Sequence, residues 1–259
     1  MILRRFIEHV KAQNWTAVAL DFLIVVVGVL MAFQITAWHE SRIEHQRSED
    51  FLARIRTDLE GDVSELTRHR EFWNDVADQG AAAVRFAETG ARGEASDRAS
   101  DWELMRAFLH ATQHWQFTFI DTTYAELRSA GELGLIRDID MRRALADYYV
   151  SVASRRGGDG PYQLNPAYRV MARGRIRSDI LQYYWSACFR QAAGVQELVD
   201  CPPPPNVADI GDVLAKFAAD EELLNALRYW VHTLALASEL TAFDLQRAAR
   251  LIELIDAQS

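Results

Sequence analysis

The sequence predicts an all-α protein, in which one N-terminal transmembrane helix continues into a long helix and then a helical bundle outside the membrane. Residues 17–38 are the first observation, because they carry no polar side chain between Phe22 and Phe33. Crossing the hydrocarbon core of a bilayer takes roughly 20 apolar residues. The second observation is that caps, glycines and prolines divide the later chain into segments of helical periodicity. No stretch shows a convincing run of strands.

Residues 17–38 have two other interpretations. A buried core helix of a soluble protein is one, since the uninterrupted apolar run is only 12 residues long. Core helices rarely carry apolar surface all the way round, which favours the membrane. A cleaved signal peptide is the other, but the apolar region is too long and lacks a small-x-small cleavage pattern after it. We therefore expect an uncleaved signal anchor.

A leader of residues 1–16 precedes the span and can lie flat on the membrane face, because its apolar positions recur at helical spacing. Trp15 and Trp38 flank the span, where tryptophan is typical of the membrane interface. The leader's basic residues favour a cytoplasmic N-terminus, although Arg42 and Arg47 follow on the other side. We expect a single-pass protein of the bacterial inner membrane with a periplasmic C-terminal domain.

Composition limits the partners of the outer part. The chain has 259 residues, of which 49% are hydrophobic and 25% charged, a balance typical of globular proteins. The net charge of −9 argues against nucleic acid as a partner. The expected partners are the lipid bilayer and either further copies of the chain or a multi-span membrane protein.

Residues 39–90 predict a long helix leading outward from the membrane. The stretch contains no proline, and its apolar side chains recur at helical spacing. Four of them lie seven residues apart: Leu52, Leu59, Leu66 and Trp73. Ile55 and Val63 fill intermediate positions, while Gly61 and Gly80 are expected weak points. Such a narrow apolar stripe faces either the helix's own domain or a neighbouring copy.

Residues 91–259 predict the helical periplasmic domain. After a polar loop at 91–99, Ser100 and Glu103 form a capping box that opens a helix to about residue 113. Residues 115–120 are interpreted as a connector. Thr123 and Glu126 suggest a second capping box, and Gly131 is expected to end that short helix.

The second half of this domain is also expected to be helical. Asp138 or Asp140 caps a helix that runs through Tyr148 and Tyr149 and is expected to end at Gly157 and Gly158. Asn165 is the expected cap, and Pro166 the first position, of a helix that continues to about residue 191. A short helix at 208–217 follows, and Asp220 caps a long final helix.

Cys188 and Cys201 lie 13 positions apart, with a glycine between them and prolines directly after. In an oxidising compartment they can close a loop by a disulfide that contributes about 3 kcal/mol. The alternative is two unrelated thiols in a cytosolic domain. We favour the disulfide, which agrees with a periplasmic location.

The segment LDFLIVVVGVLMAFQITAWHE combines an acidic residue, aliphatic residues around a glycine, and an Ala-x-Gln-x-x-x-Trp-x-Glu ending. The matching positions are Asp21, Gly28, Ala32, Gln34, Trp38 and Glu40. This segment resembles a family of bacterial single-pass membrane proteins classed only as a domain of unknown function. The stretch TYAELRSAGELGLIRDIDMRRALADYY is also similar to members, whereas His39 departs from their frequent asparagine. The resemblance implies an N-terminal anchor and a helical outer domain, without an assigned activity.

Asp21 is an ionisable residue inside the span, and such residues usually have a function because inserting one costs about 2.5–3.5 kcal/mol. Its position is similar to that of the acidic residue in the proton-carrying subunits of ion-driven motors. Those subunits carry a small α+β domain, whereas this outer domain is large and helical. The alternative is that Asp21 sits near the headgroups beside basic residues of the leader or bonds a neighbouring copy.

Gly28, Ala32 and Thr36 form a row of small residues on one helix face, and Gln34 can hydrogen-bond across an interface in lipid. This pattern favours association between spans.

The sequence gives no support to enzyme chemistry. His110 and His114 stand four apart on a predicted helix, a spacing that suits a metal, but no third ligand can be named. No nucleophile elbow, phosphate-binding loop or dinucleotide fingerprint is present. The aromatic cluster at 183–185 is most simply core. We therefore expect no catalytic residue, no metal and no cofactor.

The resulting hypothesis is a non-enzymatic membrane protein whose outer domain serves as scaffold or accessory subunit of a homo-oligomer or larger complex. Two alternatives stay open. One is an ion-coupled subunit in which Asp21 transfers protons. The other is a periplasmic ligand sensor that signals through a membrane partner.

Overall fold

A computed structural model describes residues 15–93, 100–156, 166–192 and 194–258, without the side chains of 15–18, 21, 155 and 156. The chain divides into two units, Met1–Leu52 and Ala53–Ser259. The predicted leader lies almost wholly outside the described residues, as does most of the polar loop at 91–99.

Helix α2 runs without interruption from Trp15 to Thr89, a length of 75 residues, and so belongs to both units. It ends at Gly90, whose φ of 69° is the left-handed conformation common just beyond a helix. The prediction of one continuous helix is confirmed. An 18-residue window in it has a mean hydropathy of 2.0 and is entirely unburied, so α2 is long and apolar enough to cross a membrane.

Gly61 and Gly80 are not weak points of α2, contrary to expectation. A Cβ atom at Gly61 would lie 2.7 Å from Ile120 Cδ1, and one at Gly80 would lie 2.6 Å from Val231 Cγ2. The two glycines therefore allow neighbouring segments to approach the helix closely, and packing compensates for their low helix propensity.

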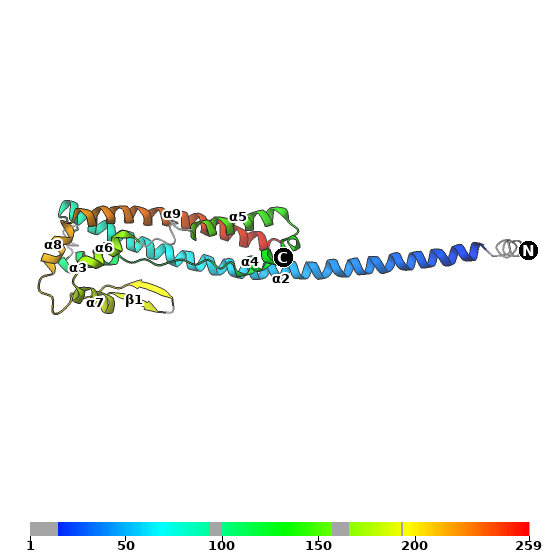
Figure 1. The fold of residues 1–259 in the computed structure, drawn as a ribbon, viewed down its shortest axis with the longest axis horizontal. Helices are drawn as coiled ribbons and strands as arrows, with labels where there is room; N and C mark the ends of the chain where they lie inside the picture. The colour runs from blue at the N-terminus through cyan, green and yellow to red at the C-terminus, as the bar shows by residue number, and fades with distance from the viewer. Residues whose placement is uncertain (1–14, 94–99, 157–165, 193, 259) are drawn as a thin grey trace, which may run out of the picture. The chain divides into compact units, whose positions relative to one another are not determined.

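The second unit consists of α2 from residue 53 onward and a series of shorter elements (Figure 1). In chain order these are α3 Asp101–His110, α4 Thr122–Ser129, the 3-10 turn η1 Leu133–Leu135, α5 Ile139–Arg156, α6 Ala167–Arg175, α7 Ser178–Ala187, β1 Phe189–Ala192, β2 Val195–Leu198, α8 Ile210–Ala218 and α9 Glu221–Asp256. The fold is all-α apart from one antiparallel two-stranded hairpin.

Helices α2 and α9 run antiparallel along the second unit (Figure 1). Three contacts show the direction: Arg56 Nε donates to Asp256 at 2.6 Å, Arg70 Nε to Ser238 at 3.3 Å, and Arg228 Nε to Glu88 at 2.8 Å. Helix α5 packs beside α9. The core therefore lies between the two long helices and the shorter ones that cover them.

The apolar stripe of α2 faces its own domain. Ile55, Leu59, Leu66 and Val76 are fully buried, and Trp73 is 1% exposed. Burying each such side chain contributes about 1.5–3 kcal/mol. Val63, which was predicted to belong to the stripe, is only half-buried. Two polar residues of the helix that were not predicted to be buried, Asp62 and His69, lie in the core.

Most predicted helix ends are confirmed. Ser100 and Glu103 form the capping box of α3, and Asp220 accepts from Leu223 N at 3.0 Å to cap α9. Asp138 accepts from the backbone of residues 140 and 141 at the start of α5. Gly131 follows α4 with a φ of 72°.

The second predicted capping box is wrong. Helix α4 begins at Thr122 after Asp121, without a side-chain cap. Thr123 lies inside the helix, and its N–H donates to Asp58 of α2 at 3.1 Å. Glu126 instead pairs with Arg54 of α2. Side chains of a neighbouring helix therefore replace the local cap.

The predicted helix from Pro166 to residue 191 is also wrong in its length. Backbone at Ile176 and Arg177 is extended, which separates α6 from α7. Arg177 bonds both Asp179 and Asp209 at this break. The chain then leaves α7 as strand β1, although no strand was expected there. Pro166 precedes α6 as its N-cap, and Asn165 lies outside the described residues.

Candidate functional site

The span residues singled out by the sequence all lie on α2. Asp21 and Trp15 are part of its backbone, but their side chains fall outside the description. Proton transfer by Asp21 accordingly stays a prediction. Trp38 is 64% exposed, and the Arg42 guanidinium lies 5.8 Å from the centre of its ring, a cation–π contact.

The row of small residues presents an open face. Beyond the neighbouring residues and backbone of its own helix, no described atom lies within 4 Å of a Cβ atom placed on Gly28, and Ala32, Gln34 and Thr36 are all exposed. The Thr36 hydroxyl donates to the Ala32 carbonyl at 3.0 Å. This bond satisfies the hydroxyl within its own helix, so Gln34 is the residue of this set that retains polar groups for a contact in lipid.

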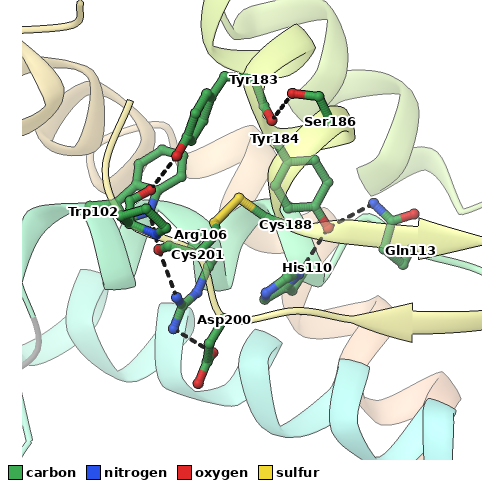
Figure 2. Close-up of a disulfide and its surroundings, with 11 residues drawn as sticks. Trp102, Arg106, His110, Gln113, Tyr183, Tyr184, Ser186, Cys188, Asp200 and Cys201 are labelled. Atoms are coloured by element: carbon green, nitrogen blue, oxygen red, sulfur yellow. Dashed lines mark hydrogen bonds and ion pairs between the residues drawn. A yellow bond between two sulfur atoms is a disulfide. The ribbon is translucent and has the colours of Figure 1, made fainter. Parts of the chain in front are cut away.

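Cys188 and Cys201 form a disulfide at the end of α7, with their Cα atoms 5.1 Å apart (Figure 2). The Cys201 carbonyl accepts from Trp102 Nε1 at 3.0 Å and from Arg106 Nη1 at 3.2 Å. Arg106 also pairs with Asp200 at 2.8 Å. Helix α3 thus holds the corner by three contacts from two side chains.

The disulfide is shielded from reagents. Cys188 is fully buried and Cys201 is 7% exposed. The Tyr183 hydroxyl donates to the Pro202 carbonyl at 2.8 Å and so fixes the chain on the other side of the bridge. Because redox-active disulfides are accessible to thiols, this arrangement is that of a structural crosslink.

Beside the disulfide, the Tyr184 hydroxyl links two polar side chains in the core, His110 and Gln113 (Figure 2). Arg173 donates to Gln113 Oε1 at 3.2 Å, which orients the amide so that its nitrogen donates to the Tyr184 hydroxyl at 3.0 Å. The hydroxyl hydrogen then points to His110 Nδ1, 2.9 Å away. His110 therefore acts as a neutral acceptor.

The charges in this network follow from burial. Burial, with the nearby Arg106 adding to it, lowers the pKa of His110 to about 3. Burial likewise lowers the pKa of Arg173 to about 10, which leaves the guanidinium charged at neutral pH. The charge lies 4.6 Å from the centre of the Trp185 ring. Of the predicted aromatic core cluster, Tyr184 is fully buried, whereas Tyr183 and Trp185 are half-buried.

The histidine pair does not form the predicted helical ligand spacing. Helix α3 ends at His110, so His114 stands in the connector that follows. His114 is 8% exposed, and its Nε2 has no hydrogen-bond partner among the described residues. Burial is the main cause that lowers the pKa of His114 to about 4. Within the described ranges, no three His, Cys, Asp or Glu side chains form a group able to hold a metal.

Asp62 is a buried acidic residue that the sequence analysis did not identify. It is fully buried on α2, where Oδ1 accepts from Ile120 N at 2.8 Å and Oδ2 from the Tyr148 hydroxyl at 2.9 Å. Burial, then the charge of Asp62, raises the pKa of Tyr148 far above its ordinary value. This carboxylate joins α2, the connector and α5.

His69 is the second buried polar residue of α2 that was missed. Its ring nitrogens face two backbone carbonyls, Glu65 O at 2.8 Å and Gln116 O at 3.2 Å. The ring lies 4.0 Å from that of Trp115 and 5.1 Å from that of Phe117, measured between centroids. Burial lowers the pKa of His69, and the two carbonyls oppose that effect. The contacts fix the connector onto α2.

Two surface hollows border α9. One, of about 190 Å³, lies between α5 and α9 and is lined by Asp147, Arg247 and Arg250 over an apolar floor. The other, of about 310 Å³, lies between the end of α2 and the start of α9. Neither contains an arrangement of nucleophile and base.

Together these features define the class: a helical domain whose core helix also carries one apolar segment able to span a membrane. No protein-family model, curated protein or solved structure matches the chain.

Proposed function

We propose that the protein is a non-enzymatic, single-pass inner-membrane protein whose helical periplasmic domain acts as scaffold or accessory subunit of a homo-oligomer or larger membrane complex. The observation that carries the proposal is that α2 contains both an exposed apolar segment and the core of the second unit. Its first part has unburied apolar side chains, and its later part supplies the core of the second unit. The same helix thus serves as anchor and as framework.

The polar interior of the second unit supports a structural role. The chain of contacts from Arg173 through Gln113 and Tyr184 to His110 joins α6, α7 and the end of α3. Asp62 similarly joins α2 to α5. Groups that catalyse reactions need an open position for substrate, whereas these groups are directed at one another.

Native mass spectrometry after gentle extraction from the native membrane tests the proposal. A closed homo-oligomer, or a fixed stoichiometry with a multi-span partner, is the expected result. A strictly monomeric species across extraction conditions would contradict it. The variant Asp21→Asn then separates assembly from proton coupling, because a lost complex assigns Asp21 to assembly, whereas an intact complex without function assigns it to proton transfer.

The state of the two cysteines tests the location. In the periplasm Cys188 and Cys201 should be joined, so thiol labelling of protein from cells, denatured without reductant, should leave both unmodified. Labelling at both positions in freshly lysed cells would place the domain in the cytoplasm.

A further inference from the structure

Helix α6 carries two half-buried arginines, Arg169 and Arg173, one turn apart. The Arg173 guanidinium donates to the Thr112 hydroxyl, to the Thr112 carbonyl and to the Gln113 amide oxygen, each at 3.2 Å. These three acceptors are neutral. Arg169 has no hydrogen-bond or ion-pair partner among the described residues. Neither guanidinium therefore pairs with a carboxylate in the part of the chain that the structure describes.

The next two arginines of the chain are paired, although they are exposed. Arg175 Nε lies 2.9 Å from Asp220, and Arg177 Nη1 lies 2.7 Å from Asp209. Burial makes a counter-charge more necessary, because it removes the water that stabilises an ion. Two half-buried cations without a carboxylate therefore indicate that the negative charge comes from outside the chain.

His114 adds an unsatisfied polar group at the same place. It follows Gln113 in the connector and is 8% exposed. Its Nε2 is buried and has no hydrogen-bond partner among the described residues. Burial first, and then the nearby charge of Arg169, lowers the pKa of His114 to about 4. The ring is therefore neutral at pH 7, and a neutral imidazole can donate a hydrogen bond from Nε2.

The start of α6 is electropositive for a second reason. The partial positive charge of a helix dipole lies at the N-terminus, and Arg169 stands in the first turn of this helix. That turn contains no acidic side chain, and the N-cap residue, Pro166, makes no side-chain cap. A cation in the first turn is unfavourable for the helix unless an anion lies nearby. The helix end therefore favours the same ligand charge as the two guanidiniums.

We propose that Arg169, Arg173 and His114 surround a binding site for a small oxyanion, either a phosphate or a carboxylate. Guanidinium groups bind both kinds of anion through paired N–H···O bonds. The bound anion supplies the counter-charge that the two arginines lack, and it gives His114 Nε2 an acceptor. The inference goes beyond the proposed scaffold role and depends neither on the anchor nor on assembly, so each proposal can fail without the other.

Thermal unfolding of the full chain in detergent at pH 7 tests the site, with inorganic phosphate and acetate as separate probes and chloride balancing the ionic strength. We expect a saturable rise in melting temperature with at least one of them. At ten times the Kd of the anion the rise should be roughly 3–6 °C. A response to phosphate alone assigns the site to phosphate groups, and a response to acetate assigns it to carboxylates. No saturable response to either probe overturns the proposal.

The variant Arg169→Gln separates anion binding from folding. It removes an unpaired charge, so without phosphate or acetate it should melt no lower than the wild type. It should weaken anion binding roughly 10–100-fold, which removes most of the shift at a concentration that saturates the wild type. Arg128→Gln is the matched control, because Arg128 is exposed on α4 without an ion-pair partner among the described residues, and it should keep the full shift.

Two outcomes for these variants contradict the site. Equal shifts in the wild type and both variants would assign the effect to salt in general. A melting temperature of Arg169→Gln that is lower than that of the wild type by the same amount with and without the anion would make Arg169 a structural residue only.

Asp159 provides the test against a counter-charge from the chain itself. It is the one acidic residue of the stretch 157–165, which lies outside the described residues. If its carboxylate fills the site, the wild type should not respond to either anion and Asp159→Asn should gain the response, which overturns the proposal. A wild-type response that Asp159→Asn leaves unchanged supports an anion from outside the chain.

Discussion

At the scale of single residues, the second unit depends on polar groups in its interior. Asp62, His69 and His110 are all at most 2% exposed, and each has hydrogen-bond partners in other segments. Such groups cost free energy when a partner is removed, since the remaining donor or acceptor stays buried. They determine which segments can pack together, in addition to the apolar contacts.

Replacing Asp62 by alanine should destabilise the protein by about 3 kcal/mol. The Tyr148 hydroxyl and the Ile120 N–H would both lose their acceptor in a buried site, at about 1–3 kcal/mol each. Denaturation in urea, followed by circular dichroism of the detergent-solubilised chain, measures the change. Tyr148→Phe is the control and should cost about 1 kcal/mol. A loss below about 0.5 kcal/mol for Asp62→Ala would contradict the assigned role.

Acid should destabilise the second unit through its buried histidines. The pKa of His114 is lowered to about 4 in the folded protein, against 6.5 for the free side chain, mainly by burial. The unfolded chain therefore binds more protons between these values, and stability falls as the pH drops from about 6.5 to 4. For His114 the full effect is about 3 kcal/mol.

His114→Leu tests this pH dependence, because leucine also removes the buried nitrogen that lacks a partner among the described residues. The stability of this variant should change little at pH 7 and fall less than that of the wild type at pH 4.5. His232→Gln, at an exposed position, should behave like the wild type. Equal losses on acidification in all three proteins would assign the pH effect to other groups.

At the scale of elements, periodicity and caps predict the helices well, because both are local. The start of α3 at Ser100 and of α9 at Asp220 follow from side chains within one turn of the helix end. The capping box expected at Thr123 failed because Asp58, on another helix, bonds that backbone instead. Contacts of that kind depend on the fold and have no local signal.

The burial of the polar residues of α2 could have been predicted from the sequence. Ile55, Asp62, His69 and Val76 stand seven apart, so Asp62 and His69 occupy positions of the apolar repeat. A polar residue at such a position is expected to be buried and bonded. The hairpin could not have been predicted in this way. Its strands, Phe189–Ala192 and Val195–Leu198, are short and mostly exposed, and their sequences show little alternation of apolar and polar residues.

Removing the disulfide should destabilise the corner between α7 and α8. The double variant Cys188→Ala, Cys201→Ala opens a loop of 13 residues, for which the chain-entropy model gives about 3 kcal/mol. Thermal unfolding with and without reductant measures the effect, which should be similar for reduced wild type and the variant. Reductant should not affect the variant further. An unchanged melting temperature would show that Trp102 and Arg106 hold the corner without the crosslink.

At the scale of the whole molecule, α2 carries two apolar surfaces that differ in whether the chain covers them. Around Gly28 the apolar surface is open, and from Ile55 onward it is covered by the chain itself. In the proposed membrane protein, the open surface around Gly28 is therefore the face of α2 on which a second helix can pack closely.

Enlarging the small-residue face of the span should therefore weaken assembly without unfolding the domain. Gly28→Leu adds a side chain where nothing lies within 4 Å, so the single chain tolerates it, but close approach of a second helix is blocked. The variant should raise the protein-to-lipid ratio at which half of the oligomer has dissociated by roughly tenfold. Native mass spectrometry from nanodiscs of graded protein density measures this ratio. Ala37→Leu, which places the same new side chain on the opposite side of the helix, is the control, and a Gly28→Leu variant that assembles like it would restrict assembly to the outer domain.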